Sequence, residues 1–301
     1  MRTQQLERSV AIAAQPARVA DYVELTKPRI TTMVVVSAAA GYYLGSDASV
    51  DVVRLLHAMA GTALIASGAS CLNQVLERDS DARMDRTRSR PLPAGRLDFL
   101  PALGFGAALS LLGAAQLAAA VNPLTAVLGV LTLALYVAVY TPLKRLTSLC
   151  TIIGAVPGAL PPVMGWTAAR DALSAEAWVL FAILFFWQMP HFLAIAAAYR
   201  DDYARGGHVV LPVIDGDGAS TARQTMLYLF ALIPVSLLPS VLHMSGTVYF
   251  WGALALGAGF LAVGMHAARD RSIPAERRLL RYSVLYLPAL LALMTVDKVA
   301  A

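Results

Sequence analysis

The stretch NQVLERDSDARMDRTRSRPLP, residues 73–93, follows directly on a long apolar run and carries the pattern that indicates the fold. Asn73, Glu77, Asp81 and Asp85 recur in it every four residues, with arginines between them. On an α-helix each step of four residues turns the side chain by about 40°, so neighbouring members of the series lie along one face. Polar groups that begin inside an apolar run are costly in a bilayer and are usually functional. The stretch therefore predicts a membrane helix that ends in an oxygen-rich face.

The rest of the chain has the composition of a polytopic membrane protein. Of its 301 residues 58% are hydrophobic and only 14% are charged, which lies outside the usual range of soluble domains. Apolar runs of about twenty residues, the length that crosses a bilayer, recur along the chain. We expect nine transmembrane helices, at 30–46, 52–76, 98–120, 123–141, 148–168, 175–199, 222–243, 246–268 and 280–297. The predicted fold class is all-α, with an N-terminal segment, 1–29, before a single membrane domain, 30–298.

The distribution of positive charge predicts how the chain is oriented in a membrane. All but three of the 24 lysines and arginines fall in the N-terminal segment or beside the even-numbered loops, and the exceptions are Arg54, Arg170 and Lys298. Because positively charged loops stay in the cytoplasm, the N-terminus is expected there and the C-terminus outside. We therefore expect an integral membrane protein, whose partner is the lipid bilayer and not nucleic acid.

Neither a cleaved signal nor a cysteine site is expected. The only apolar island of the first 29 residues, Val10–Ala14, is too short for the core of a signal peptide. Cys71 and Cys150 lie in or beside apolar runs, which indicates buried small residues and neither a disulfide framework nor a zinc site.

The oxygen-rich face of the second predicted helix is typical of a magnesium site. Carboxylate and amide oxygens suit a hard cation such as Mg²⁺, which usually keeps further positions for water and substrate phosphate. Guanidinium groups pair with phosphate oxygens in a two-pronged geometry. The arginines close to the acids are Arg78, Arg83, Arg86, Arg88 and Arg90. The sequence therefore favours a metal–diphosphate site over a solvated loop whose arginines only fix the topology.

A basic pair, Lys144 and Arg145, ends the fourth predicted helix on the same side of the membrane. Such a pair is either a topological anchor or a partner for an anionic substrate. Charged clusters also leave the second and sixth predicted helices, which are four helices apart and so emerge on one side. That relation favours two like halves that face one cavity.

The segment that ends the sixth predicted helix, 187–213, is the third concentration of polar chemistry. His191 and Asp202 are eleven residues apart, close to three helical turns, so we expect them to share a face, with Tyr199 about 80° away. Pro190 would spoil this phase if it kinks the helix. His191 is either a structural residue bonded to a neighbouring helix or a functional group.

Four segments together resemble the UbiA superfamily of intramembrane prenyltransferases, and within it the heme-modifying branch of protoheme IX farnesyltransferases. They are DYVELTKPR (21–29), NQVLERDSDARMDRTRSRPLPAG (73–95), YTPLKRLTSLCTIIGAVPGALPPVMGW (140–166) and WQMPHFLAIAAAYRDDYARGGHVVLPV (187–213). The resemblance implies nine helices around a central cavity that opens to the cytoplasm. It also implies that farnesyl diphosphate binds through Mg²⁺ to acidic motifs after helices two and six, and that heme b is the acceptor substrate.

The resemblance also implies roles for individual residues. Asn73, Glu77, Asp81 and Asp85 would carry the first metal–diphosphate site. The second superfamily motif usually holds two aspartates four apart, but this chain has Tyr199 and Tyr203 at the aligned positions. Asp201 and Asp202 lie beside them as catalytic candidates, and Asp202 is the candidate for a second metal. Residues expected to bind diphosphate or heme are His191, Lys144, Arg145, Arg86, Arg88, Arg90, Tyr199 and Tyr203.

Two other functions share parts of this pattern. A prenyltransferase that acts on an aromatic quinone precursor would use the same acidic face, and WQMPHF and DDYARGG are the segments that argue against it. A transporter of ions or small anions would need polar groups through the middle of the membrane, whereas the strong charge clusters here lie on one side. If the product is a farnesylated heme, a downstream heme-modifying enzyme is a further candidate partner.

Overall fold

The computed structural model describes residues 18–47 and 49–299, and this part of the chain is α-helical without a β-strand. The all-α class is therefore confirmed. The first 17 residues of the predicted N-terminal segment lie outside the described residues. The boundary between segment 1–29 and domain 30–298 stays a prediction, and a short helix, α2 (Val19–Leu25), occupies part of that segment.

The helices follow the predicted spans closely. They are α3 (Pro28–Gly45), α4 (Val52–Asp81), α5 (Phe99–Ala120), α6 (Pro123–Ala134), the π-helix η1 (Leu135–Tyr140), α7 (Thr141–Leu143), α8 (Cys150–Ala159), α9 (Pro161–Arg170), α10 (Ala175–Ala198), α11 (Arg200–Gly206), α12 (Leu211–Ile214), α13 (Ala219–Val241), α14 (Thr247–Asp270) and α15 (Ile273–Val296). Among the described residues, eight helical segments are long and apolar enough to cross a membrane. The remaining predicted span, the first one at 30–46, corresponds to α3, which packs along α9 in the bundle.

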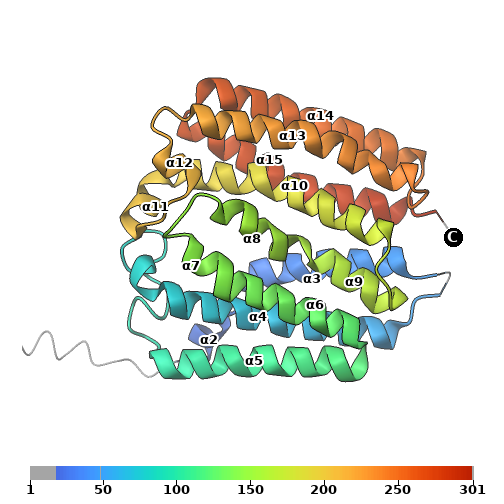
Figure 1. Cartoon of the computed structure of the whole chain (residues 1–301), viewed down its shortest axis with the longest axis horizontal. Coiled ribbons are helices and arrows are strands. Elements are labelled where there is room, and N and C mark those ends of the chain that lie inside the picture. Colours follow the sequence, from blue (N-terminus) through green and yellow to red (C-terminus); the bar gives the residue numbers. More distant parts are fainter. Residues whose placement is uncertain (1–17, 48, 300–301) are drawn as a thin grey trace, which may run out of the picture.

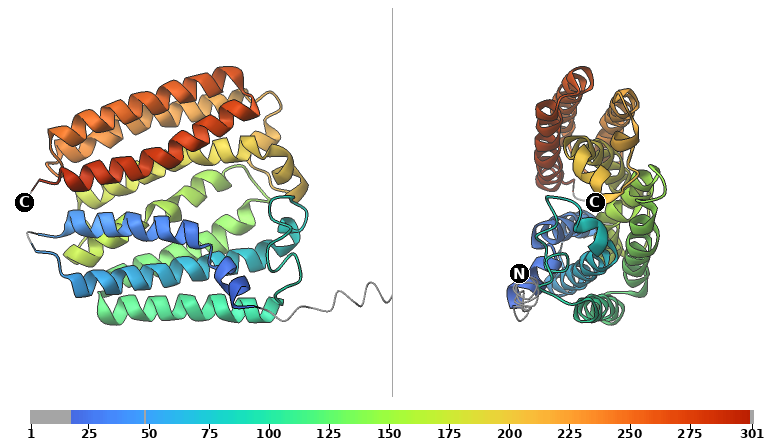
Figure 2. Two further views of the ribbon diagram at one scale, coloured as in Figure 1. Left: turned by 180° about the vertical axis from the view of Figure 1, so that it is seen from behind. Right: turned by 90° about the vertical axis from the view of Figure 1, so that its left-hand side faces the viewer.

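The long helices lie side by side in one bundle (Figure 1). Seen end on, α3, α4 and α5 form one side and α13, α14 and α15 the other, with α8 and α10 between them (Figure 2). The loop after α4, the end of α7 and the short helices α11 and α12 gather at one end of the bundle, and the C-terminus lies at the other (Figure 1). The loops that carry the predicted site are therefore neighbours in space.

Two spans depart from a regular α-helix. The fourth span passes through the π-helical turn η1, a feature that is frequent at functional sites, before it reaches Thr141 and Lys144. The fifth span, predicted as one helix, breaks at Leu160 because the two prolines that come next cannot donate backbone hydrogen bonds. In contrast, α10 runs through Pro190 without interruption.

Close backbone contact between α3 and α9 gives the first testable prediction. A methyl group on Gly165 would overlap the backbone of Ala38, and one on Gly41 would overlap that of Pro162. Overpacking of such a contact costs about 1–3 kcal/mol. We therefore expect Gly165→Ala to lower the unfolding temperature of the purified protein in a thermal-shift assay. Gly104→Ala on α5 is the matched control, because open space surrounds that position, and equal stability of the two variants would contradict the prediction.

Candidate active site

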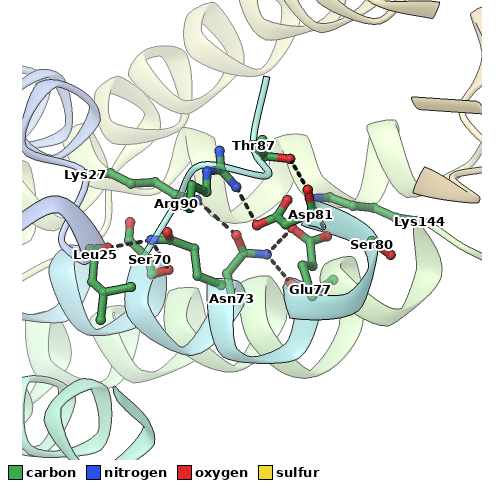
Figure 3. Close-up of polar contacts among 12 residues, drawn as sticks. Leu25, Lys27, Ser70, Asn73, Glu77, Ser80, Asp81, Thr87, Arg90 and Lys144 are labelled. Atoms are coloured by element: carbon green, nitrogen blue, oxygen red, sulfur yellow. Dashed lines mark hydrogen bonds and ion pairs between the residues drawn. The ribbon is translucent and has the colours of Figure 1, made fainter. Parts of the chain in front are cut away.

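The last turns of α4 present three buried polar side chains on one face. Asn73 and Asp81 are each 1% exposed and Glu77 is 5% exposed. Figure 3 shows the three side chains pointing to the same side of the helix. The four-residue spacing is thus helical as far as Asp81, because α4 continues five residues beyond its predicted end at 76. These groups would be costly to bury unless they were paired or held a ligand.

Each of the three side chains contacts a cation from a different segment (Figure 3). Lys144 Nζ at the end of α7 lies 2.8 Å from Glu77 Oε1, and Arg90 Nη1 from the loop after α4 lies 2.7 Å from Asp81 Oδ2. Lys27 Nζ, just before α3, donates to Asn73 Oδ1 at 3.0 Å. The site therefore contains two buried carboxylates, each paired with a basic side chain, and a lysine bonded to the amide beside them.

Hydrogen bonds fix the orientation of the acidic side chains. Asn73 Nδ2 donates to Glu77 Oε2 at 2.9 Å and to Thr141 Oγ1 at 3.0 Å. The loop after α4 turns back because Thr87 Oγ1 donates to the carbonyl oxygen of Asp81 at 2.8 Å, which brings Arg90 over that residue. The two carboxylates are therefore held in place by contacts with α7 and with the loop.

Lys27 is a site residue that the sequence pattern did not reveal, since by sequence this lysine is one of the charges that set topology. Its backbone is left-handed (φ 48°), and the preceding helix α2 is tied to α4 by Gln74 Nε2, which donates to the carbonyl oxygen of Leu25 at 2.8 Å. Burial, with repulsion from Arg90 and Lys144, lowers the pKa of Lys27 to about 7. The only sequence signal was its position in TKPR at the entrance to the first span.

The donor set fits Mg²⁺ that is shared with a diphosphate. Among residues 18–47 and 49–299, no cluster of three or more His, Cys, Asp or Glu side chains could by itself hold a metal ion. Mg²⁺ is usually held by one or two carboxylates together with water and substrate phosphates, and the buried pair Glu77 and Asp81 meets that requirement. In the part of the chain that the structure describes, Glu77 Oε1 also has no hydrogen-bond partner beyond its ion pair with Lys144.

Asp85 does not continue the face of α4, so the expected four-residue series is wrong at its last member. The helix ends at Asp81, and Asp85 lies in the following loop. There its backbone N–H donates to Asp202 Oδ1 at 2.9 Å, while Arg205 Nη2 contacts Asp85 Oδ2 at 2.7 Å and also pairs with Asp202. Asp85 and Asp202 therefore join the loop after α4 to α11.

Asp202 is buried and Asp201 is exposed. Burial favours the neutral carboxyl, but the N–H of Asp85 and the guanidinium of Arg205 outweigh it and lower the pKa of Asp202. Asp202 is thus an ionised group in an arginine pair. Its role as a ligand of a second metal stays a prediction.

The two tyrosines at the aligned positions of the second motif both contact one arginine. The guanidinium carbon of Arg86 lies 5.1 Å from the ring centroid of Tyr199 and 4.4 Å from that of Tyr203. Arg88 is exposed and pairs with Asp85 at 3.4 Å. Of the arginines in the loop after α4, Arg90 is the one whose guanidinium contacts the buried acids of α4.

The residues just after α7 are tied to the last turn of α4 and to the segment after α11. Arg145 Nη2 donates to Ser80 Oγ at 2.7 Å, and the carbonyl oxygen of Lys144 accepts from the N–H of Val209 at 2.7 Å. Next to that contact lies His208, which is buried. Its ring packs edge-on against that of Tyr203, with the ring centroids 5.6 Å apart. Burial lowers the pKa of His208 to about 4, so it is neutral at neutral pH. His208 could not be singled out from the sequence, because no local pattern marks it.

His191 and Asp202 do not share a helical face, contrary to the expectation. α10 ends at Ala198, and Tyr199 has a non-helical backbone before α11 begins. The change of direction breaks the phase between the two residues. Asp202 packs against the loop after α4, whereas His191 contacts Ser283 of α15.

Comparisons with known proteins agree with this arrangement. The UbiA prenyltransferase family matches residues 34–287. The protoheme IX farnesyltransferase of Solibacter usitatus is 51% identical over 287 residues, which cover 92% of this chain and 98% of the relative.

Two solved structures share the fold. A digeranylgeranylglyceryl phosphate synthase has a TM-score of 0.78 at 15% identity and covers 93% of this chain and 98% of its own. A UbiA homolog from Archaeoglobus fulgidus, bound to GPP and Mg²⁺, has a TM-score of 0.66 at 14% identity and covers 91% and 99%. The sequence match and the helical bundle lead to one conclusion: the chain belongs to the UbiA prenyltransferase family.

Proposed function

We propose that this chain transfers the farnesyl group of farnesyl diphosphate to a vinyl group of heme b, with addition of water, to give heme O and diphosphate. The observation that carries the diphosphate half is the pair of buried carboxylates, Glu77 and Asp81, which pair with Lys144 and Arg90, while Lys27 bonds to the neighbouring Asn73. The acceptor half is supported by the 51% identity to a protein named protoheme IX farnesyltransferase.

The leaving group would be held at the end of α4. Mg²⁺ bound to Glu77 and Asp81, with Asn73 beside them, would neutralise the diphosphate and so lower the barrier to breaking the allylic C–O bond. The three cations that now pair with these side chains are expected to turn to the phosphate oxygens when the metal takes the carboxylates. Lysine and arginine both bind phosphate well, the latter in a two-pronged geometry.

The bond changes of the proposed reaction balance with water as the third reactant. The allylic C–O bond breaks and diphosphate leaves with the electron pair. The vinyl π electrons of the heme then form the new C–C bond, and water adds to the resulting cation and loses a proton. The membrane-embedded bundle would keep bulk water from the allylic cation until the vinyl group has reacted.

The proposed setting is a bacterial inner membrane, with the site at the cytoplasmic face. In support, the basic loops after α4, α7 and α10 gather at one end of the bundle, as the charge distribution predicts (Figure 1). An intramembrane enzyme of this kind would draw both substrates from the lipid bilayer and its surface. Its product would pass to a downstream heme-modifying enzyme.

The second prediction is the reaction itself. Purified protein incubated with heme b, farnesyl diphosphate and Mg²⁺ is expected to give a heme that has gained farnesyl plus water, detected by mass spectrometry. Chelation of the metal with EDTA is expected to abolish the product, and added Mg²⁺ to restore it.

Two outcomes would contradict the proposal in different ways. A prenylated aromatic acid in place of a prenylated heme would replace the acceptor and leave the diphosphate site standing. No product with either acceptor, from protein that still binds farnesyl diphosphate, would contradict the transfer reaction. Within the described residues, the buried acid–base pairs of the site, Glu77–Lys144 and Asp81–Arg90, lie at one end of the bundle. A translocation path needs polar groups through the middle of the membrane, so this placement disfavours a transporter.

A further inference from the structure

His191 belongs to a cluster between α10 and α15 that the diphosphate site does not use. Its Nδ1 lies 2.7 Å from the hydroxyl oxygen of Ser283. The indole N–H of Trp187, one turn earlier on α10, donates to the backbone carbonyl oxygen of the same serine at 2.8 Å. The rings of Trp187 and His191 stack with centroids 4.9 Å apart and planes inclined by 20°. The imidazole is therefore fixed by two contacts, one at its edge and one on its face.

The proton count around Ser283 sets the tautomer of His191. The serine hydroxyl carries one hydrogen, and its oxygen lies 2.6 Å from the carbonyl oxygen of Leu280, which can only accept. The hydroxyl therefore donates to Leu280 and accepts from His191. It follows that Nδ1 carries the ring proton, and in a neutral imidazole Nε2 then keeps its lone pair.

Nε2 is free to bind a ligand. Within residues 18–47 and 49–299, Nε2 has no hydrogen-bond partner, whereas Nδ1 has one. Nε2 is also not one of the polar atoms that are fully buried without a partner. The atom thus keeps accessible surface, although the side chain as a whole is only partly exposed. In a metal-ligating histidine, one ring nitrogen usually binds the metal while the other nitrogen of the same ring is held by a hydrogen bond.

We propose that His191 Nε2 binds the iron of the acceptor heme, and that Ser283 is the positioning residue that holds His191 in the tautomer this bond requires. The proposal rests on the proposed function, because it takes heme b as the acceptor. Imidazole is a common ligand of iron. A heme propionate is the wrong partner for this nitrogen, because a lone pair repels a carboxylate and offers it no proton.

The depth of the cluster suits a shared active site. His191 lies seven residues before the end of α10, so at 1.5 Å per residue it is about 10 Å from the loops at that end. Glu77 lies four residues before the end of α4, or about 6 Å by the same measure. Both groups therefore lie in the same half of the bundle, with the iron position deeper than the diphosphate.

The test titrates ferric heme b into wild-type protein in lipid nanodiscs without farnesyl diphosphate, so that no turnover occurs. Absorption and electron paramagnetic resonance are expected to report histidine-ligated iron. His191→Ala is expected to lose that signature and to bind heme at least about tenfold more weakly, with the signature restored by added imidazole. Ser283→Ala keeps His191 but removes the hydrogen bond that orients its imidazole ring. We expect about tenfold weaker heme binding, as for other residues that orient a metal ligand.

The matched control is Ser236→Ala. Ser236 is as fully buried as Ser283 and also contacts α15, through the hydroxyl of Tyr286 at 2.9 Å, so it reports the loss of a buried hydroxyl alone. We expect it to bind heme like the wild type. Mg²⁺-dependent binding of farnesyl diphosphate is expected to be unchanged in all three variants, which shows that they fold.

The outcomes separate this inference from the proposed function. A wild-type spectrum and affinity in His191→Ala, with heme product still formed, would overturn the inference and leave the acceptor assignment intact. Ser283→Ala that behaves like Ser236→Ala would overturn the positioning role. Wild-type protein that binds farnesyl diphosphate but no heme would overturn both.

Discussion

Asp81→Asn is expected to lower the rate of prenyl transfer by about 10²–10³-fold, the usual loss when one preorganised electrostatic group is removed from an active site. The substitution keeps the shape of the side chain and an oxygen that can accept from Arg90, so folding should be preserved. It removes the negative charge that would hold Mg²⁺, and it weakens the pair that now holds Arg90 at 2.7 Å. Turnover of heme b with farnesyl diphosphate, measured across Mg²⁺ concentrations, is the appropriate assay.

Asp79→Asn is the matched control for this variant. Asp79 lies two residues earlier on α4, but its side chain is 80% exposed, and its one ion pair within the described residues is with its neighbour Arg78, whose Nε lies 3.3 Å from Asp79 Oδ1. An exposed pair of this kind contributes little, so wild-type turnover is expected. If Asp81→Asn retained the turnover of Asp79→Asn at every Mg²⁺ concentration, Asp81 would have no part in metal binding.

The spacing of the acids shows how far local sequence carries a structural prediction. Asn73, Glu77 and Asp81 share a face because a helix imposes that face on every fourth residue. The same rule failed for Asp85, since spacing alone does not mark the residue at which α4 ends. The end is set by contacts with distant segments, among them the bond from the Asp85 N–H to Asp202, 117 residues later.

Residues that join the site from elsewhere could not be found from local sequence. Lys27 bonds to Asn73 across 46 residues, and no pattern in either segment specifies that pairing. The break at Tyr199 ended the helical phase expected between His191 and Asp202, although Pro190, the expected cause of a break, is accommodated within α10. In contrast, the order and approximate number of the spans can be predicted from hydropathy, because every crossing needs its own apolar run.

The contacts of Glu77 allow two interpretations, which its burial alone does not separate. In a purely structural ion pair, Glu77 and Lys144 would only neutralise one another between α4 and α7. In an active site, Lys144 holds the carboxylate ready until a metal takes its place. A buried ion pair is weak evidence for stability in itself, because two apolar or neutral residues often replace it without loss. Removal of both charges should therefore spare turnover if the pair is structural and abolish it if the pair is catalytic.

Lys144→Met is expected to destabilise the protein by about 3–5 kcal/mol, the usual cost of leaving one partner of a buried ion pair without the other. Glu77 is 5% exposed, and Asn73 Nδ2 would remain as its one hydrogen-bond donor. The measurement is the unfolding temperature of the purified protein, and turnover is expected to fall with it.

The double variant Glu77→Gln/Lys144→Met then separates structure from function. It removes both charges, and the glutamine can still accept from Asn73, so we expect most of the lost stability to return. Turnover is expected to stay about 10²-fold or more below the wild type, because the carboxylate that would hold Mg²⁺ is gone. If the double variant regained turnover together with its stability, Glu77 and Lys144 would be a structural pair, and Asp81 would be left as the one buried carboxylate for the metal. Stability without turnover would instead show that this end of α4 keeps its charges for catalysis.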